Sequence, residues 1–491
     1  MNVEGGVPTR GQGDEPFSRR FVNVFFAVYF VLGLGLMAYT PPFQSADAFS
    51  HFDRAAGIAS GQIIASSLNH FGGSFLPSGV INLEDGFSTL PFNPASRVTS
   101  TQYPDGWLQS WATPKVFVQY TTGGNLPFLY LPQAAGIVVG RLLSNHILVS
   151  FYLAQISNLL VFIALTRLAF ARLPRRLAIP IGIFLFFPTV VSVATSVNPD
   201  SLLLALSVVF ATMCWSGSRG DPNAESLIVE ESRADRRRQR RCPTNLTYLL
   251  AFASLFFMSL EKPPLMVLGL LLPMADHARG IRRYVALVSV FVASVVIIFV
   301  GWASFGSHGQ SGPPTGGPST AYRQLVLTVT DPVKDIQVLW ATFRYWGWLF
   351  TKQAVAGIAW LDISFPTWVY LSLVLFFLLA LASAVRVGRS DLARVGWSLL
   401  VIVATYVATA FSLYILANQY AVGRIYGFQG RYLLPMLPIL IIVLGLHPRE
   451  TRLTSRVTAV VQEYAPIYLV CMQILFAVEC AVMIRERYWL K

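Results

Sequence analysis

Three polar side chains that could carry chemistry follow the first apolar stretch of the chain. Asp47, His51 and Arg54 are spaced so that a helix over residues 46–60 would present them on one face. A carboxylate beside an imidazole and a guanidinium can take a proton from a hydroxyl group, so Asp47 is a candidate general base. Asp53 falls nearer the apolar face and ranks below Asp47. On spacing alone a structural role is favoured, in which Asp47 stabilises the helix N-terminus.

Basic side chains beside two breaks between apolar stretches could bind a phosphate. Lys262 stands in the break Glu261-Lys262-Pro263-Pro264, where phosphate binding and simple snorkelling to the interface are equally weighted. Arg424 and Arg431 flank a short glycine-containing loop. Arginine binds two phosphate oxygens at once and stays charged in a partly apolar cleft. Contact with anionic lipid headgroups is the alternative, but Arg431 opens a helix end, which favours phosphate binding.

Four further residues are candidates for supporting roles. Asp200 ends the segment Asn198-Pro199-Asp200, which predicts a turn and a helix N-cap; a functional role requires Asp200 to line the same cavity as Asp47. Gln429 and Tyr432 neighbour Arg431, and Tyr130 could stack on a sugar ring or belong to an interfacial aromatic belt. No metal-ligand spacing and no cofactor fingerprint occurs in a fitting context, so a divalent metal is not indicated.

The elements that must position these residues are apolar helices. Hydrophobic residues make up 54% of the 491 residues and charged residues 12%, about half of the 25% that soluble domains carry. Runs long enough to span a bilayer occur along the whole chain. We therefore expect an all-α polytopic membrane protein of about eleven spans, with no soluble domain. The net charge of +13 does not indicate nucleic-acid binding, because the basic residues cluster at the ends of apolar runs.

Those basic clusters predict the topology through the positive-inside rule. Residues 1–20 form a disordered cytoplasmic N-terminus and residues 21–485 one transmembrane domain. Two long loops, 40–125 and 306–365, lie outside and contain juxtamembrane helices, and the basic loop 218–243 lies inside. The expected spans are 21–39, 146–166, 177–196, 201–217, 245–260, 264–275, 284–305, 367–385, 395–416, 432–446 and 464–484.

Two further segments are expected beside the membrane, and one span departs from the charge rule. The proline-containing segment 126–141 is too short for a span and is interpreted as a juxtamembrane or re-entrant helix. The helix over 46–60 is expected to lie on the membrane with its apolar face down. The last span leaves Arg485, Arg487 and Lys491 outside, a mild violation of the charge rule.

The four cysteines avoid the outer loops, so no disulfide framework is expected. His70, His146 and His277 are isolated and are interpreted as structural.

The order of these motifs resembles a bacterial family of polytopic membrane proteins catalogued as a domain of unknown function. That family looks related to the GT-C superfamily of membrane glycosyltransferases. The matching elements, in chain order, are Pro41-Pro42 with Asp47, His51, Arg54 and Ala55; Asn125 to Pro132 with Tyr130; Ser196, Asn198 and Asp200; Lys262-Pro263-Pro264; and Gln429-Gly430-Arg431-Tyr432 with Pro435. The resemblance covers about residues 20 to 445. The family's Asp-Glu pair is Asp47-Ala48 here, which puts metal binding or two-carboxylate chemistry in doubt.

The resemblance implies a function and partners. GT-C enzymes use polyprenyl-phosphate sugars as donors and place a catalytic acidic residue just after the first span, where Asp47 stands. Lys262, Arg424 and Arg431 would then hold the donor phosphate, with a cell-envelope glycan or lipid as acceptor. Membrane lipids are the other expected partners, and the bacterial cytoplasmic membrane, with the site outside, is the expected location.

Three alternatives stay open at this point. A transporter or flippase of lipid-linked glycans predicts charges along a path from both leaflets, whereas the unusual charges here lie outside. A glycan polymerase or ligase would use two lipid-linked substrates. A non-catalytic envelope-assembly protein is compatible with the carboxylate lost at Ala48.

Overall fold

A computed structural model describes most of the chain. The described ranges are 15–69, 71–218, 243–275, 281–306, 317–385, 392–445 and 452–490. Several sequence expectations fall elsewhere: most of the N-terminal segment 1–20, most of the basic loop 218–243, and the residues His70, Cys242 and His277 lie outside the described residues.

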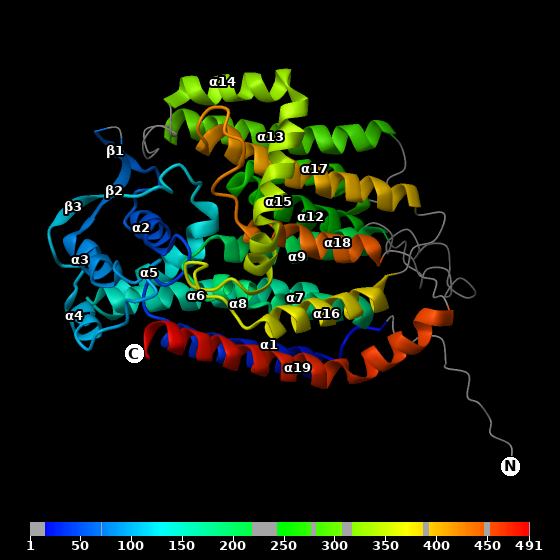
Figure 1. Cartoon of the computed structure of the whole chain (residues 1–491), viewed down its shortest axis with the longest axis horizontal. Coiled ribbons are helices and arrows are strands. Elements are labelled where there is room, and N and C mark those ends of the chain that lie inside the picture. Colours follow the sequence, from blue (N-terminus) through cyan, green and yellow to red (C-terminus); the bar gives the residue numbers. More distant parts are fainter. Residues whose placement is uncertain are drawn as a thin grey trace, which may run out of the picture.

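Six helices in the described ranges are long and apolar enough to cross a membrane. They run side by side in Figure 1 and are α1 (Arg19–Tyr39), α6 (Ile147–Phe170), α13 (Ile281–Gly306), α16 (Thr367–Ala384), α17 (Leu392–Ala417) and α19 (Arg452–Tyr488). Two further helices, α7 (Arg175–Leu185) and α8 (Pro188–Ala194), meet at 72° and together would make a seventh span. The expected membrane character of the chain and its mainly helical structure are thereby supported.

Shorter apolar helices occupy the remaining expected spans. They are α9 (Asp200–Ser218), α12 (Pro243–Glu261), the 3-10 helix η2 (Pro263–Ala275), and the 3-10 helix η5 (Gly430–Met436) that continues into α18 (Leu437–Leu444). Two of them contain an internal proline, Pro273 in η2 and Pro435 in η5, which removes a backbone hydrogen-bond donor. Six or seven candidate spans are therefore present among the described residues, and the count of eleven stays a prediction.

Residues 40–125 form a small mixed subregion at one end of the helices (Figure 1). It contains α2 (Ala48–Ala59), α3 (Ser78–Phe87), α4 (Gln102–Leu108) and three strands, β1 (Ser66–Leu68), β2 (Phe71–Pro77) and β3 (Lys115–Gln119). The strands pair antiparallel in the order β1-β2-β3, with Gly73 opposite both Ser66 and Gln119. This sheet departs from the all-α expectation, because strands this short leave little period-two pattern in the sequence.

The helix expected over 46–60 is present as α2, but its surroundings differ from the expectation. Most of its residues are buried, including His51, Asp53 and Arg54. It packs against β2 and against α5 (Leu131–Leu143), which follows the short 3-10 helix η1 (Phe128–Tyr130). The expectation of a helix lying on the membrane with its apolar face down is therefore wrong, since Phe52 and Ala56 of that face are buried in protein. The segment expected as a juxtamembrane or re-entrant helix over 126–141 corresponds to η1 and α5.

Residues 306–365 are largely helical. They contain α14 (Gly317–Thr330) and α15 (Pro332–Ala356). Helix α15 crosses the direction of the long helices (Figure 1) and exposes Trp340, Tyr345 and Trp348. Exposed aromatic side chains on such a helix are typical of a membrane interface. The interfacial position expected for this segment stays a prediction.

The end of α19 lies against the subregion formed by residues 40–125. The backbone N–H of Val98 donates to the carbonyl of Tyr488 at 2.9 Å. Arg487 donates to the carbonyls of Leu90 and Ser96 and pairs with Asp362 at 3.1 Å. Figure 1 shows the C-terminus at this same end of the molecule. Arg487 therefore has protein partners, which explains how a cation is accommodated there.

Candidate functional site

Asp47 stands where the chain turns into α2. Its backbone has φ 61°, a left-handed conformation that aspartate adopts more readily than most residues. Its side chain makes no capping hydrogen bond to α2. Instead, its Oδ2 atom lies 2.5 Å from Nη2 of Arg431, and the carboxylate remains 45% exposed. Asp47 therefore pairs with a residue far away in the sequence, and its carboxylate stays accessible.

Arg431 is held in position by the close approach of η5 to α15. A Cβ atom at Gly430 would collide with the carbonyl oxygen of Phe350, so only glycine fits there. The backbone N–H of Gly430 donates to Oε1 of Gln353 at 2.9 Å. The side chain of Arg431 is only 5% exposed, and its Nε lies 3.7 Å from Oδ2 of Asp200. Within the described part of the chain, its Nε and Nη1 atoms have no hydrogen-bond partner.

Asp200 and Lys262 complete the group. Lys262 is the single residue between α12 and η2, and its Nζ lies 2.6 Å from Oδ1 of Asp200. Asp200 begins α9, where its backbone N–H donates to the side-chain oxygen of Asn198 at 2.9 Å. The expected turn and cap at Asn198 are therefore present. Lys262 also lies over the ring of Tyr432, 4.5 Å from its centroid.

Four charged residues from distant parts of the chain thus meet in one place. We call this set, Asp47, Asp200, Lys262 and Arg431, the ion cluster. Arg431 contacts both Asp47 and Asp200, whereas the expectation that the two carboxylates line one cavity stays a prediction. The two cations face the two carboxylates, so the cluster is balanced without a ligand.

A second set of hydrogen bonds joins α2 to η1 and to the end of α12. Nδ1 of His51 lies 2.9 Å from the hydroxyl of Tyr130. The amide of Asn125 donates to that hydroxyl and to Oε1 of Glu261, both at 3.0 Å. Sequence reasoning did not single out Asn125 or Glu261 as site residues, although Glu261 adjoins Lys262 and Asn125 lies in the Tyr130 motif.

His51 is neutral at physiological pH. Burial, together with the nearby cations Arg431 and Lys262, lowers its pKa to about 4, although Asp47 and Asp200 act in the opposite direction. A neutral imidazole can donate a hydrogen bond through one nitrogen and accept through the other. His51 is therefore suited to hydrogen-bond Tyr130 through one nitrogen and a second group through the other, and not to act as a cation.

The remaining candidates lie beside the ion cluster or apart from it. Arg54 is fully buried and donates to the carbonyls of Ile63 at 2.9 Å and Asn125 at 2.8 Å. Arg424 stacks on the ring of Tyr345 at 4.2 Å. Within the described ranges no ion pair links either arginine to the ion cluster. Gln429 precedes η5, and its buried side-chain oxygen has no hydrogen-bond partner among the residues described.

The residues described contain no group of three His, Cys, Asp or Glu side chains placed to hold a metal ion. Three of the four cysteines are described, and Cys214, Cys471 and Cys480 are free thiols.

The helices and the ion cluster define a polytopic helical membrane protein with a charged site at the meeting point of several chain segments. The chain belongs to the DUF2142 family of predicted membrane proteins, whose family model matches residues 30–440. The resemblance to a family of unknown function is thereby confirmed. No curated protein matches the chain. Among solved structures, ArnT from Cupriavidus metallidurans bound to undecaprenyl phosphate is similar at 13% identity and a TM-score of 0.35, over 96% of this chain and 77% of that one.

Proposed function

We propose that the protein is a GT-C-like membrane glycosyltransferase with about eleven spans. It would transfer a sugar from a polyprenyl-phosphate donor to a cell-envelope glycan or lipid. The site would face the outside of a bacterial cytoplasmic membrane. The observation that carries this proposal is the ion cluster, in which an accessible carboxylate, Asp47, adjoins a buried guanidinium, Arg431, and a partly exposed ammonium, Lys262.

Arg431 and Lys262 would bind the donor phosphate. Nε and Nη1 of Arg431 are buried without a hydrogen-bond partner in the described part of the chain, and Arg431 lines a cavity, so a phosphate oxygen could bind there once Asp47 or Asp200 moves aside. Lys262 is 24% exposed and could turn from Asp200 towards the same anion. Cations fixed in place before the reaction stabilise the negative charge that develops on a leaving phosphate. Arg424 could join them only by leaving its aromatic partner Tyr345.

Asp47 would act as the general base. The acceptor oxygen attacks the anomeric carbon of the sugar, and the bond between that carbon and the phosphate oxygen breaks. The acceptor's proton passes to the Asp47 carboxylate, and polyprenyl phosphate departs with the bonding electron pair. A single displacement of this kind inverts the anomeric configuration. Arg54 and His51 would position α2 through Asn125 and Tyr130, and a base is effective only when it is held within hydrogen-bond reach of its proton.

The experiment compares Asp47→Asn with Asp105→Asn in lipid nanodiscs. Asp105 is exposed in α4 and serves as the matched control. The readout is transfer of labelled sugar from a polyprenyl-phosphate donor to extracted envelope lipid and glycan. We expect Asp47→Asn to lose about 10²-fold or more of the transfer rate, the usual contribution of a general base, and Asp105→Asn to match the parent protein.

The outcomes separate the alternatives. Full transfer by Asp47→Asn would exclude Asp47 as the base. Donor binding without transfer by the parent protein would favour a non-catalytic envelope-assembly protein. Movement of a lipid-linked glycan between leaflets of a proteoliposome, again without transfer, would favour a transporter or flippase.

A further inference from the structure

Three cavities adjoin one another between the flank of the helices and Arg431. The first lies between α1, α8 and α19, the second reaches from Thr40 to Ser196, and the third lies beside Arg431. The first two share Leu36, Val191 and Cys480 in their walls. The last two share Ser45 and Ser196. Neighbouring cavities thus share wall residues, and we call the three together the lateral path.

The outer part of the lateral path is an apolar groove between two candidate spans. Tyr29, Leu32 and Leu36 line it from α1, and Phe476 and Cys480 line it from α19. These residues recur every three or four positions, so each helix contributes one face.

The groove continues along α1 as far as Thr40, which lines the next cavity. At 1.5 Å per residue, the distance from position 29 to position 40 is about 16 Å. Apart from Gln473, the side chains in the groove wall are apolar, aromatic or the Cys480 thiol. An apolar surface of this length suits one extended hydrocarbon chain.

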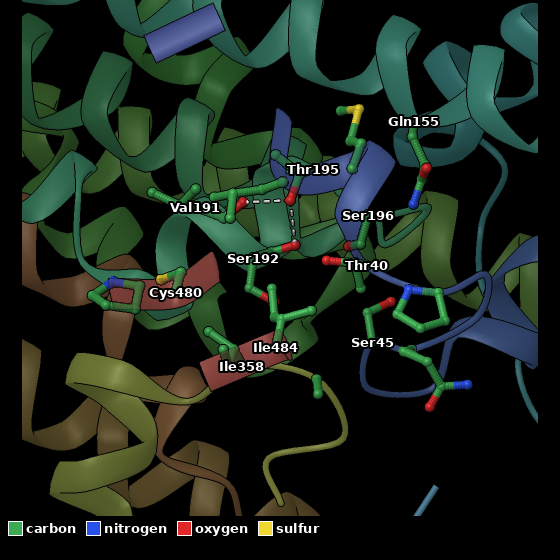
Figure 2. A pocket seen from close by; sticks show the side chains of 16 residues that line it. Thr40, Ser45, Gln155, Val191, Ser192, Thr195, Ser196, Ile358, Cys480 and Ile484 are labelled. Atoms are coloured by element: carbon green, nitrogen blue, oxygen red, sulfur yellow. Dashed lines mark hydrogen bonds between the residues drawn. The ribbon is translucent and has the colours of Figure 1, made fainter. Parts of the chain in front are cut away.

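The middle cavity has a different chemistry (Figure 2). No charged residue lines it, and its polar wall consists of hydroxyl and amide groups from Thr40, Gln44, Ser45, Gln155, Ser192, Thr195 and Ser196. Gln155 belongs to α6, is 9% exposed, and its side-chain oxygen has no hydrogen-bond partner among the residues described. A buried amide oxygen without a partner costs free energy that a ligand hydroxyl would recover. This wall suits an uncharged, hydroxylated group, whereas a phosphate needs cations.

The inner cavity brings the lateral path to the ion cluster. Arg431 lines it, together with Ala46 and Asn198. Asp47 follows Ala46 in the chain and contacts Arg431. A ligand that filled the groove and the middle cavity would therefore present its far end to the ion cluster.

We propose that the lateral path binds a single-chain amphiphile whose head is uncharged and carries hydroxyl groups. Its chain lies between α1 and α19, and its head lies in the middle cavity beside Gln155. Under the proposed function, on which this role rests, the amphiphile is the acceptor, and a hydroxyl of its head reaches Asp47. The acceptor is then a membrane-embedded glycolipid and not a soluble glycan, and the donor phosphate approaches from the Lys262 side.

Cys480 provides a reporter in the wall of the groove. The test uses a variant that keeps only this thiol (Cys214→Ala, Cys242→Ala, Cys471→Ala) in nanodiscs, and measures its alkylation by N-ethylmaleimide with mass spectrometry. The probes are dodecyl glucoside and dodecyl phosphate, which differ only in their heads. At ten times its dissociation constant, dodecyl glucoside should slow alkylation about tenfold by mass action. Dodecyl phosphate at the same concentration should have a much smaller effect.

Two controls make the result specific. A variant that keeps only Cys471, which is exposed on the same helix, should be alkylated at the same rate with and without either probe. Gln155→Leu in the Cys480 variant should weaken protection by dodecyl glucoside about threefold or more, as loss of one hydrogen bond predicts, and should leave protection by dodecanol unchanged.

Each outcome bears on the proposal separately from the proposed function. Equal alkylation with and without dodecyl glucoside overturns the lateral path as a ligand site. Stronger protection by dodecyl phosphate overturns the uncharged head and assigns the groove to the donor's chain. Protection of Cys480 together with full transfer by Asp47→Asn upholds the site while the proposed chemistry fails. Loss of transfer in Asp47→Asn without protection of Cys480 upholds the chemistry and overturns the site.

Discussion

The guanidinium of Arg431 lies 2.5 Å from the carboxylate of Asp47, although 384 positions separate the two residues in the chain. The same guanidinium lies 3.7 Å from Asp200. Helix η5 therefore closes onto the residue that precedes α2. A guanidinium held between two carboxylates has a fixed orientation before any ligand arrives, and fixed charges need no reorganisation when a transition state forms.

Arg424 and Arg431 should differ in their effect on phosphate binding. Arg431→Lys keeps the charge but loses the planar fork, so affinity for a polyprenyl monophosphate should fall about tenfold, the equivalent of about 1.4 kcal/mol. Arg424→Lys should change affinity by less than about twofold, because Arg424 stacks on Tyr345 and loss of a single exposed contact is worth little. Binding is measured in nanodiscs with radiolabelled lipid. A larger loss of affinity in Arg424→Lys than in Arg431→Lys would show that Arg424 binds the phosphate instead.

Acidification should destabilise the protein through His51. Burial lowers its pKa to about 4, while the unfolded chain titrates near 6.5. The folded state then binds fewer protons than the unfolded state between these values. Stability is at its full value above pH 6.5 and falls as the pH decreases to 4, by about 3 kcal/mol in all. The charges that face the imidazole are Asp47, Asp200, Arg431 and Lys262.

The pH effect is measured by the unfolding temperature in detergent between pH 7.5 and 4.5. His51→Gln does not titrate and can still accept the hydrogen bond of Tyr130, so its unfolding temperature should fall less on acidification than that of the parent. His146→Gln is the matched control, because His146 is exposed. Parallel pH curves for the parent and His51→Gln would contradict a buried neutral imidazole.

Local spacing predicted the helix that carries Asp47 and His51, and the breaks at Asn198, Lys262 and Gly430. These features depend on residues a few positions apart, and periodicity and turn chemistry report on that range. Spacing alone favoured a capping role for Asp47 over a catalytic role. It could not reveal the contact between Asp47 and Arg431, because no local pattern encodes a pairing between segments that distant.

Two features of the site had almost no sequence signal. The three-stranded sheet packs against α2 through β2, but its strands are short and two glycines interrupt β2, so they show little alternation. Arg54 was grouped with Asp47 by helical spacing, yet its guanidinium binds backbone carbonyls at Ile63 and Asn125. A side chain's direction from a helix can be predicted, whereas the identity of the group that it meets depends on tertiary packing.

Gly430 should be required for the position of Arg431. Gly430→Ala would force a methyl group against the carbonyl of Phe350 in α15 and push η5 outward. We expect destabilisation of about 1–3 kcal/mol from overpacking, with a weaker affinity for polyprenyl monophosphate. Gly423→Ala is the control, since its Cβ would meet nothing within 4 Å and its backbone is not left-handed. Both variants are compared by unfolding temperature and lipid binding. Equal unfolding temperatures and equal lipid binding in the two variants would show that the position of η5 does not depend on its close contact with α15.

The two ends of α6 should lie on opposite sides of the membrane. Val98 bonds to Tyr488, which joins the end of α19 to the subregion over residues 40–125. Helix α6 begins beside that subregion, since Ile147 donates to the carbonyl of Gln109. Position 167 is twenty residues further along α6, or about 30 Å at 1.5 Å per residue, which is the thickness of a hydrocarbon core. Arg167 therefore belongs to the opposite side, where its guanidinium contacts Asn23 near the start of α1.

Single cysteines at three exposed positions test this arrangement in a cysteine-free protein. Asn93→Cys and Leu490→Cys should both react with a membrane-impermeant maleimide added to intact spheroplasts. Arg167→Cys should react only after permeabilisation, because arginine-rich helix ends stay in the cytoplasm. Reaction at position 93 without reaction at position 490 would contradict the contact between Val98 and Tyr488. Reaction at all three positions from outside would contradict the assignment of α6 as a span. Reversal of the pattern would place the ion cluster in the cytoplasm, where an extracytoplasmic transfer reaction is excluded.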